Sequence, residues 1–365
     1  MKVLIFLPHK FYLKKIAGIT FLKRIVNELI KAKIYDIFVL SNLIPNDNNS
    51  NSVIKIVKKK SDIKEVLGEK YILIDLPAVF DHEFIQDFIR KNPEDIKSFS
   101  SVIQGNYKGI FIPIYTEKEI KKAEKALIKS LRKPHDTLIS KYLNRPISLF
   151  VSSLLMNTKI TPNMITIFVV IIGLLASFIM VLKPDYYGGL IGGILFHLSS
   201  VLDGCDGEIA RLKYQTSKIG VWLDNIGDEL TNFVFIGAVG IYNSTYYKNE
   251  IFFKTSLLFM LIFLVSKIMQ YFLIIKGYKK EDIAQFDIET EKIKKGLIKK
   301  IVNFFVSIAK VVARNDFFAL SMMIAGITSL FNIAQIIIGL VVTGLFIGVV
   351  IEFIKIIFGA KNEKN

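Results

Sequence analysis

The chain has 365 residues, and it joins a hydrophobic fraction of 52% and a mean hydropathy of +0.44 to a charged fraction of 22%. Soluble globular proteins rarely combine such values, so the composition favours a membrane domain joined to a polar domain. The net charge of +16 suits nucleic acid or an anionic membrane surface. Because long apolar segments are present, we expect the membrane and no nucleic-acid partner. The single Cys205 excludes an intramolecular disulfide and a cysteine-based zinc site.

The first third of the chain alternates short apolar runs with segments of helical period. The expected strands are KVLIFL (2–7), DIFVLS (36–41), KYILIDLP (70–77) and GIFIPI (109–114), and the expected helices cover 19–32, 61–68, 81–91 and 116–133. Strands that alternate with helices predict right-handed βαβ units and a Rossmann-like α/β domain with a parallel sheet. The polar stretch IPNDNNSNS (44–52) is expected to form a loop.

Long apolar segments dominate the rest of the chain. Six membrane spans are predicted, at 163–182, 187–211, 217–242, 251–275, 315–332 and 334–357. Before them, residues 139–156 form an amphipathic, basic segment that is typical of a helix lying at the membrane interface. The predicted domains are therefore an α/β domain at 1–132, a connector with the interfacial helix at 133–162, and an all-α domain of six transmembrane helices at 163–358.

Basic residues gather on one side of the predicted spans. The loop 276–300 carries eight lysines, and the end of the chain, GAKNEKN (359–365), is basic too. The N-terminal MKVLIFLPHK has no small-residue cleavage site and is expected to be a strand rather than a signal peptide. The positive-inside rule then places the N-terminal domain, the C-terminus and the acidic cluster described next in the cytosol.

Acidic residues interrupt the second and third apolar segments in a regular pattern. On a helix, one face carries Asp203, Asp206, Gly207, Ala210 and Arg211, at i, i+3, i+4, i+7 and i+8. On the next helix, Gly220, Asp224 and Asp228 form a second stripe. The short polar link at 212–219 predicts antiparallel neighbours with their stripes opposed, so that four carboxylates converge.

Four converging carboxylates repel one another unless cations are bound. An all-oxygen ligand set suits Mg²⁺ first and Mn²⁺ second, and two ions fit the charge better than one. The small residues between the carboxylates leave a slot for a flat ligand group, and Arg211 offers a fork for a phosphate. Helix caps, lysine pairs, or the ion or proton path of a transporter are the alternatives. The clustering of the acids at one mouth, beside small residues, favours metal over these.

The spacing Asp203-x2-Asp206-Gly207-x2-Ala210-Arg211-x8-Gly220-x3-Asp224-x3-Asp228 resembles the signature of the CDP-alcohol phosphotransferases at every position. The segment NTKITPNMIT (157–166) also resembles the start of that family's first span, and the resemblance covers roughly 139–358. It implies a membrane enzyme of six helices, a homodimer through its membrane domain. An acceptor hydroxyl attacks the phosphorus of a CDP-alcohol, and CMP leaves.

The resemblance also implies residue roles. Metal ligands would be Asp203, Asp206, Asp224 and Asp228, with Asp206 bridging two ions and Asp228 acting as the general base beside Asp224. CDP would be bound by Gly207, Ala210, Arg211, Gly220, Asp203, Pro162 and Asn163. Three further basic residues, Lys267, Arg314 and Arg145, are candidates for binding a phosphorylated acceptor. Snorkelling, pairing with an acidic residue and lipid head-group contact are the alternatives for these three.

The N-terminal domain is similar in outline to sugar-phosphate nucleotidyltransferases, and some CDP-alcohol phosphotransferases carry such a cytidylyltransferase domain. Active members have a Gly-rich loop with an arginine after the first strand. Here that place has LPHKFYLKKIAG (7–18), so we expect a degenerate domain with a structural or regulatory role. The expected donor is CDP-diacylglycerol or an ether-lipid analogue, in phospholipid biosynthesis. The alternative is the synthesis of di-myo-inositol-phosphate-phosphate from CDP-inositol and inositol phosphate.

Overall fold

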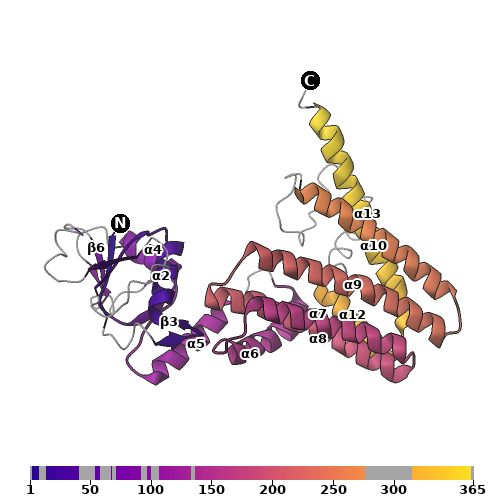
Figure 1. The fold of residues 1–365 in the computed structure, drawn as a ribbon, viewed down its shortest axis with the longest axis horizontal. Coiled ribbons are helices and arrows are strands. Elements are labelled where there is room, and N and C mark those ends of the chain that lie inside the picture. Colours follow the sequence, from indigo (N-terminus) through magenta and orange to yellow (C-terminus); the bar gives the residue numbers. More distant parts are fainter. Residues whose placement is uncertain are drawn as a thin grey trace, which may run out of the picture. The chain divides into compact units, whose positions relative to one another are not determined.

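The computed structural model describes residues 2–7, 14–40, 54–57, 67, 71–91, 97–99, 107–132, 136–275 and 315–362 (Figure 1). Two compact units interleave along the chain. Unit 1 comprises Met1–Pro134, Leu149–Ile160 and Glu208–Gln215, and unit 2 comprises His135–Ser148, Thr161–Gly207 and Thr216–Asn365. The predicted boundaries at residues 132 and 162 divide the chain into consecutive domains. Unit 1 instead also contains two short segments of the helical half.

Unit 1 is built on a parallel sheet of five strands. In the order β5-β4-β1-β6-β8 these are β5 (Ile54–Val57), β4 (Asp36–Leu40), β1 (Lys2–Ile5), β6 (Tyr71–Ile74) and β8 (Lys97–Ser98). Val3, Leu4 and Ile5 of the central strand are at most 2% exposed, as expected for a strand covered on both faces. The predicted parallel sheet is confirmed, and β5 and β8 are strands that the apolar pattern did not indicate.

Three helices of unit 1 lie where the sequence predicts them. They are α2 (Phe21–Lys31), α4 (His82–Lys91) and α5 (Glu117–Ser130). Phe21, Ile25 and Leu29 repeat every four residues and therefore lie on one face of α2. This apolar face is buried. At the start of α5, Thr116 and Glu119 form a reciprocal capping box. The helix predicted at 61–68 and the loop predicted at 44–52 lie outside the described residues, apart from Leu67, which is helical and buried.

Two short antiparallel pairs correct the sequence prediction. Strand β9 (Phe111–Pro113) was expected in the parallel sheet, but it pairs antiparallel with β7 (Ala78–Phe80) in a sheet of its own. Pro113 lacks an N–H and therefore suits the edge of a small sheet. The unpredicted hairpin of β2 (Lys15–Ile16) and β3 (Ile19–Thr20) turns at Ala17 and Gly18, both with positive φ.

The helical half contains a helix at every position where a span was predicted. They are α7 (Pro162–Leu182), α8 (Tyr186–Lys213), α9 (Lys218–Tyr246), α10 (Ile251–Ile275), α12 (Asn315–Thr328) and α13 (Phe331–Asn362). Within the described residues, α7, α8, α10 and residues 331–350 of α13 are long and apolar enough to cross a membrane, while α12 is a shorter apolar helix. Six membrane spans therefore remain a prediction. The predicted interfacial segment is helical, as the short π-helix η3 (Ser140–Asn144) followed by α6 (Arg145–Leu155).

Small residues and aromatic stacking hold the helices of unit 2 together. Phe196 of α8 stacks on Phe235 of α9 with 3.7 Å between the ring centroids. Helix α9 also packs on α7, α10 and α13. Gly173 of α7 lies so close to Thr231 of α9 that a Cβ there would clash with the threonine methyl group. Close approach at small residues is the usual way in which membrane helices associate.

Candidate active site

The two predicted acidic stripes meet at one end of α8 and α9. Carboxylate oxygens of Asp203 and Asp206 on α8 and of Asp224 on α9 lie within 4.8 Å of one another. Since Phe196 of α8 also contacts Phe235 of α9, residues earlier in α8 meet residues later in α9. The two helices are therefore antiparallel, as predicted. Four linking residues, 214–217, separate the helices, and this forces the end of one and the start of the other together.

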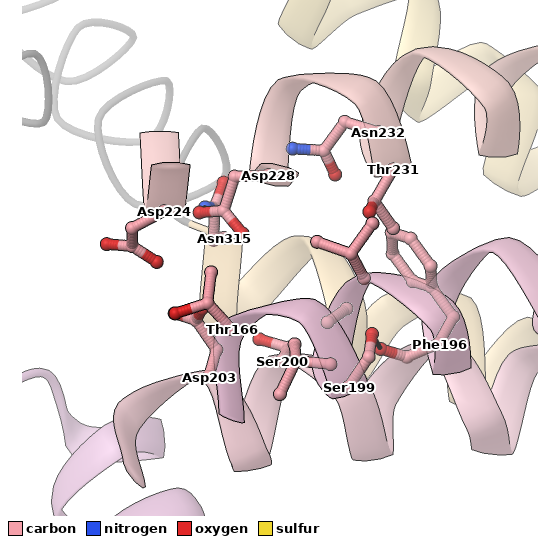
Figure 2. Close-up of a pocket in the computed structure, with 13 residues that line it drawn as sticks. Thr166, Phe196, Ser199, Ser200, Asp203, Asp224, Asp228, Thr231, Asn232 and Asn315 are labelled. Carbon is pink, nitrogen blue, oxygen red and sulfur yellow. Dashed lines mark hydrogen bonds between the residues drawn. The ribbon is translucent and has the colours of Figure 1, made fainter. Parts of the chain in front are cut away.

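The fourth carboxylate, Asp228, lines the same cavity as Asp203 and Asp224 (Figure 2). Its Oδ2 accepts a hydrogen bond of 3.1 Å from the side-chain nitrogen of Asn315, at the start of α12. The wall is completed by polar side chains of α8 and α9 and by apolar neighbours. These lining residues are Thr166, Val169, Val170, Phe196, Ser199, Ser200, Thr231, Asn232 and Ala319. The acidic cluster thus lies beside a small cavity whose lining includes hydroxyl and amide groups.

Thr166 of α7 is a site residue that the sequence analysis missed. Its Oγ1 donates a hydrogen bond of 2.5 Å to Oδ2 of Asp206, and the threonine is buried with 4% exposure. It lies one helical turn after Pro162, so a hydroxyl in an otherwise apolar run was the available signal. A hydrogen bond to a ligating carboxylate fixes the direction of its lone pairs and thus tunes metal affinity.

The donor set of the cluster fits a hard divalent cation. Three carboxylates supply only oxygen ligands, and two of them come from consecutive turns of one helix. Oxygen-only sets of this kind are preferred by Mg²⁺ and Mn²⁺ over softer transition metals. Asp203, Asp206 and Asp224 would hold such an ion, with Asp228 lining the adjoining cavity. The acidic triad therefore agrees with a divalent metal and leaves its identity open.

The small residues of the two stripes lie on the expected helices. Gly207, Ala210 and Arg211 continue α8 after Asp206. At the start of α9, the backbone N–H of Gly220 donates to the capping hydroxyl of Ser217. A Cβ at Gly220 would stand 3.2 Å from the side-chain oxygen of Asn163, so two residues predicted to bind CDP are neighbours.

Pro162 is the first residue of α7, whose N-cap is Thr161. This places the proline where its missing N–H is no loss to the helix.

Two of the three basic residues predicted to bind an acceptor are engaged in ion pairs. Lys267 of α10 contacts Glu229 of α9 at 2.6 Å. Arg145 forms a two-pronged ion pair with Asp136, at 3.0 and 3.2 Å, and its Nη1 would lie 3.6 Å from a Cβ at Gly204 of α8. Arg145 thus lies beside the acid-bearing turn of α8. Arg314 and the lysine-rich loop 276–300 lie outside the described residues.

Within the described residues, four helices are long and apolar enough to cross a membrane, and three carboxylates converge in a set that suits a divalent metal. Comparison with known proteins identifies the family of the chain. The sequence model of the CDP-alcohol phosphatidyltransferases matches residues 159–350, more than half of the chain. The chain belongs to the CDP-alcohol phosphatidyltransferase family, as the spacing of its acidic residues predicted.

Three curated relatives match part of the chain, and each is named a bifunctional IPC transferase and DIPP synthase. The protein from Aquifex aeolicus is 34% identical over 133 residues, which are 36% of this chain and 30% of the relative. That from Thermococcus kodakarensis is 38% identical over 125 residues (34% and 28%), and that from Archaeoglobus fulgidus 31% over 133 residues (36% and 26%). The matched part therefore spans less than a third of each relative's own length.

Proposed function

We propose that this protein is a metal-dependent CDP-alcohol phosphotransferase that transfers a substituted phosphate from CDP-inositol to an inositol phosphate and releases CMP. The observation that carries the reaction type is the convergence of Asp203, Asp206 and Asp224 within 4.8 Å. The preference for inositol substrates is supported by the names of the relatives. This substrate pair was the alternative in the sequence analysis.

The residues around the cluster have separate tasks in this proposal. A bound divalent ion would neutralise charge on the diphosphate of the donor. Asp228 takes the proton of the acceptor hydroxyl, and Asn315 holds the carboxylate through its 3.1 Å hydrogen bond. Gly207, Ala210 and Gly220 leave room for the cytidine beside the helix backbones. The direct displacement uses no covalent enzyme intermediate.

A lipid donor, CDP-diacylglycerol, is the second candidate because unit 2 has an apolar cavity of about 690 Å³ between α7, α9 and α10. Its walls carry Leu174, Phe178, Ile241 and Met260 among other apolar side chains. Acyl chains are the part of a lipid donor that such a wall would accept. The two candidates share the CDP group and differ in the alcohol that it carries.

The test is CMP release by the purified full chain in detergent with Mg²⁺. CDP-inositol with inositol 1-phosphate and CDP-diacylglycerol with a panel of polar alcohols form the two arms. We expect release in the first arm, loss on adding a chelator, and loss in Asp224→Asn. Full activity in Asp224→Asn, or release in the lipid arm alone, would contradict the proposal. The same proposal includes dimerisation through unit 2, which measurement of the mass of the purified protein tests. It also places the site in the cytosol, which cysteine labelling from each side of the membrane tests.

We further propose that the N-terminal α/β domain is a degenerate cytidylyltransferase. In the parallel sheet β1 is central, and the chain adds strands on one side of it (β4, β5) and then on the other (β6, β8). This strand order supports a nucleotidyltransferase-like origin. The segment 8–13, which corresponds to part of the phosphate loop, lies outside the described residues and contains neither glycine nor arginine. Pyrophosphate release from CTP and inositol 1-phosphate by the full chain would overturn the degeneracy.

A further inference from the structure

The last turn of α8, which carries Ala210 and Arg211, ends in the same kind of turn as α2, α9 and α12. The backbone N–H of Gln215 donates to the carbonyl of Ala210 at 2.8 Å, which is the longer bond of a Schellman motif. The residue between helix and loop in that motif has positive φ and is usually glycine. Here it is Tyr214, with φ of +52°. Lys33, Lys248 and Ser329 take the same conformation after α2, α9 and α12, so what sets Tyr214 apart is the set of groups around its side chain.

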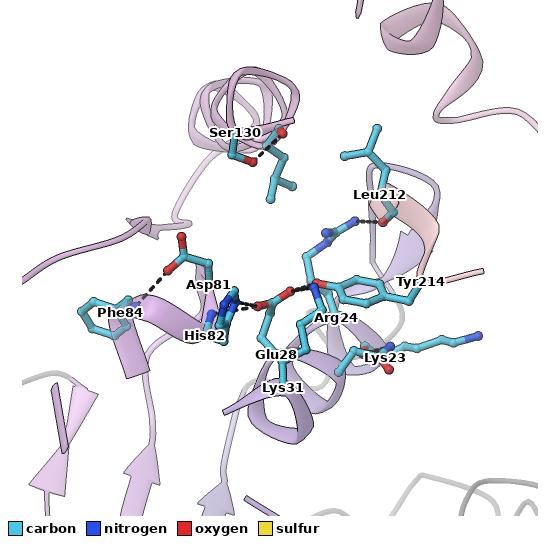
Figure 3. A network of polar contacts seen from close by, with 12 residues as sticks. Lys23, Arg24, Glu28, Lys31, Asp81, His82, Phe84, Ser130, Leu212 and Tyr214 are labelled. Carbon is cyan, nitrogen blue, oxygen red and sulfur yellow. Dashed lines mark hydrogen bonds and ion pairs between the residues drawn. The ribbon is translucent and has the colours of Figure 1, made fainter. Parts of the chain in front are cut away.

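Side chains of the α/β domain hold Tyr214 in place (Figure 3). All of the groups concerned lie within unit 1. The ammonium of Lys31 stands 4.4 Å, and the guanidinium carbon of Arg24 5.4 Å, from the centroid of the tyrosine ring. The phenol donates to the carboxylate of Glu28, which also accepts the backbone N–H of His82 at 2.8 Å. The ring is therefore fixed by two cations and its hydroxyl by one anion.

Arg24 also completes the hydrogen bonding of α8. Its Nη2 donates at 3.0 Å to the carbonyl of Leu212, in the last helical turn, and at 3.0 Å to the carbonyl of Ile16. Carbonyls at a helix C-terminus have no partner within the helix, and a cation there also interacts favourably with the helix dipole. Arg24 is 2% exposed, and this burial lowers its pKa, while Tyr214 and Glu28 act in the opposite direction.

The same small region joins α8 to the segment that leads into α7. Lys213 donates to the carbonyls of Thr158 and Ile160, both at 2.8 Å. A Cβ at Gly18, in the β2–β3 turn, would clash with the carbonyl of Met156, and the Gly18 N–H donates to Asn157 at 3.0 Å. The domain therefore contacts both segments next to the predicted CDP-binding residues, at the end of α8 and just before Pro162.

We propose that Arg24, Glu28 and Tyr214 are positioning residues for the donor nucleotide. Through them the degenerate α/β domain fixes the last turn of α8, and with it Ala210 and Arg211, in the conformation that receives the CDP group. This inference rests on the proposed function for its substrate. It gives the α/β domain a task in catalysis that needs no nucleotide pocket of its own.

The test compares full-length Arg24→Met and Tyr214→Phe with two controls, Arg90→Met and Tyr35→Phe. Arg90 and Tyr35 are exposed residues of the same domain outside this contact. Amide hydrogen exchange of residues 210–215 is measured first, then the dissociation constant of CDP, and then KM and kcat for the CDP-alcohol. We expect faster exchange at 210–215 and CDP binding weakened by about 10- to 150-fold, the range for loss of one charge-assisted hydrogen bond. KM should rise by the same factor at nearly constant kcat.

Tyr214→Gly separates positioning from a purely structural role. Glycine suits the positive φ, so CDP binding should stay unchanged if residue 214 serves only to end the helix. The positioning role predicts that Tyr214→Gly weakens CDP binding at least as much as Tyr214→Phe does. Unchanged exchange at 210–215 in Arg24→Met would overturn the proposal, and so would faster exchange with unchanged CDP affinity. If the wild type releases no CMP while CDP binding still weakens in Arg24→Met, the proposed reaction fails and the positioning role stands.

Discussion

Replacing Thr166 by valine removes one hydroxyl and nearly preserves the shape of the side chain. In the structure that hydroxyl donates at 2.5 Å to the buried Asp206 carboxylate. A hydrogen bond to a charged group contributes about 1.5–3 kcal/mol. At 1.4 kcal/mol per tenfold change, its loss should raise the Mg²⁺ concentration for half-maximal activity by about 10- to 150-fold. The maximal rate at saturating metal should change far less, because the carboxylates themselves remain.

The assay for Thr166→Val is CMP release as a function of Mg²⁺ concentration. A direct titration with Mn²⁺, followed by its magnetic resonance signal, measures metal affinity without turnover. Thr166→Ser keeps the hydroxyl and is the matched control, so it should remain near wild type. If valine leaves the half-saturating metal concentration unchanged, or if serine is as weak as valine, the threonine does not orient Asp206 and the reasoning is refuted.

Three further predictions concern packing, an ion pair and pH. Gly173→Ala places a methyl group against the threonine opposite it on α9, and should destabilise the protein by about 1–3 kcal/mol in thermal unfolding. Gly344→Ala, with nothing within 4 Å of the new Cβ, should be nearly neutral. Lys267→Met strands the Glu229 carboxylate and should cost about 3 kcal/mol, which the double variant with Glu229→Gln should largely restore. Activity that stays lost in the stable double variant would favour the acceptor-binding role of Lys267. Hydrogen bonds from a lysine side chain and a backbone N–H hold the pKa of Asp87 at about 2. Because that pKa is lowered by folding, its stabilising effect is complete above about pH 4 and is lost as the pH falls towards 2. The protection of the α4 amides, which is the intrinsic exchange rate divided by the observed one, should fall over this range in the wild type and be nearly independent of pH in Asp87→Asn.

The acidic stripes were predictable because helical geometry alone places Asp203 beside Asp206, and a short link brings the next helix back. Only spacing along the chain is needed for that step. The hydrogen bonds of Thr166 and Asn315 were not predictable in the same way. Each depends on how a third or fourth helix packs against the pair, and that packing is decided by contacts such as Gly173 against Thr231.

The parallel sheet was predicted from strong apolar runs. The strands that this prediction missed or misplaced have a physical explanation. Strand β8 has only two residues and β5 reads IKIV, so neither gives a periodic signal. Strand β9 does look like a buried strand, and the sequence could not show that its partner would be the three-residue β7. Likewise the tyrosine after α8 is an ordinary residue in the sequence, and its positive φ becomes visible only in the fold.

Tyr214 has a consequence for any attempt to shorten the protein. Arg24, Glu28 and Lys31, which all contact Tyr214, belong to residues 1–134. With tyrosine, the ending is shared between distant parts of the chain, because Arg24 supplies the donor for the Leu212 carbonyl. Truncation would leave Tyr214 in place and remove these contacts. We therefore expect deletion of residues 1–134 to disturb the last turn of α8 as well as to remove the α/β domain.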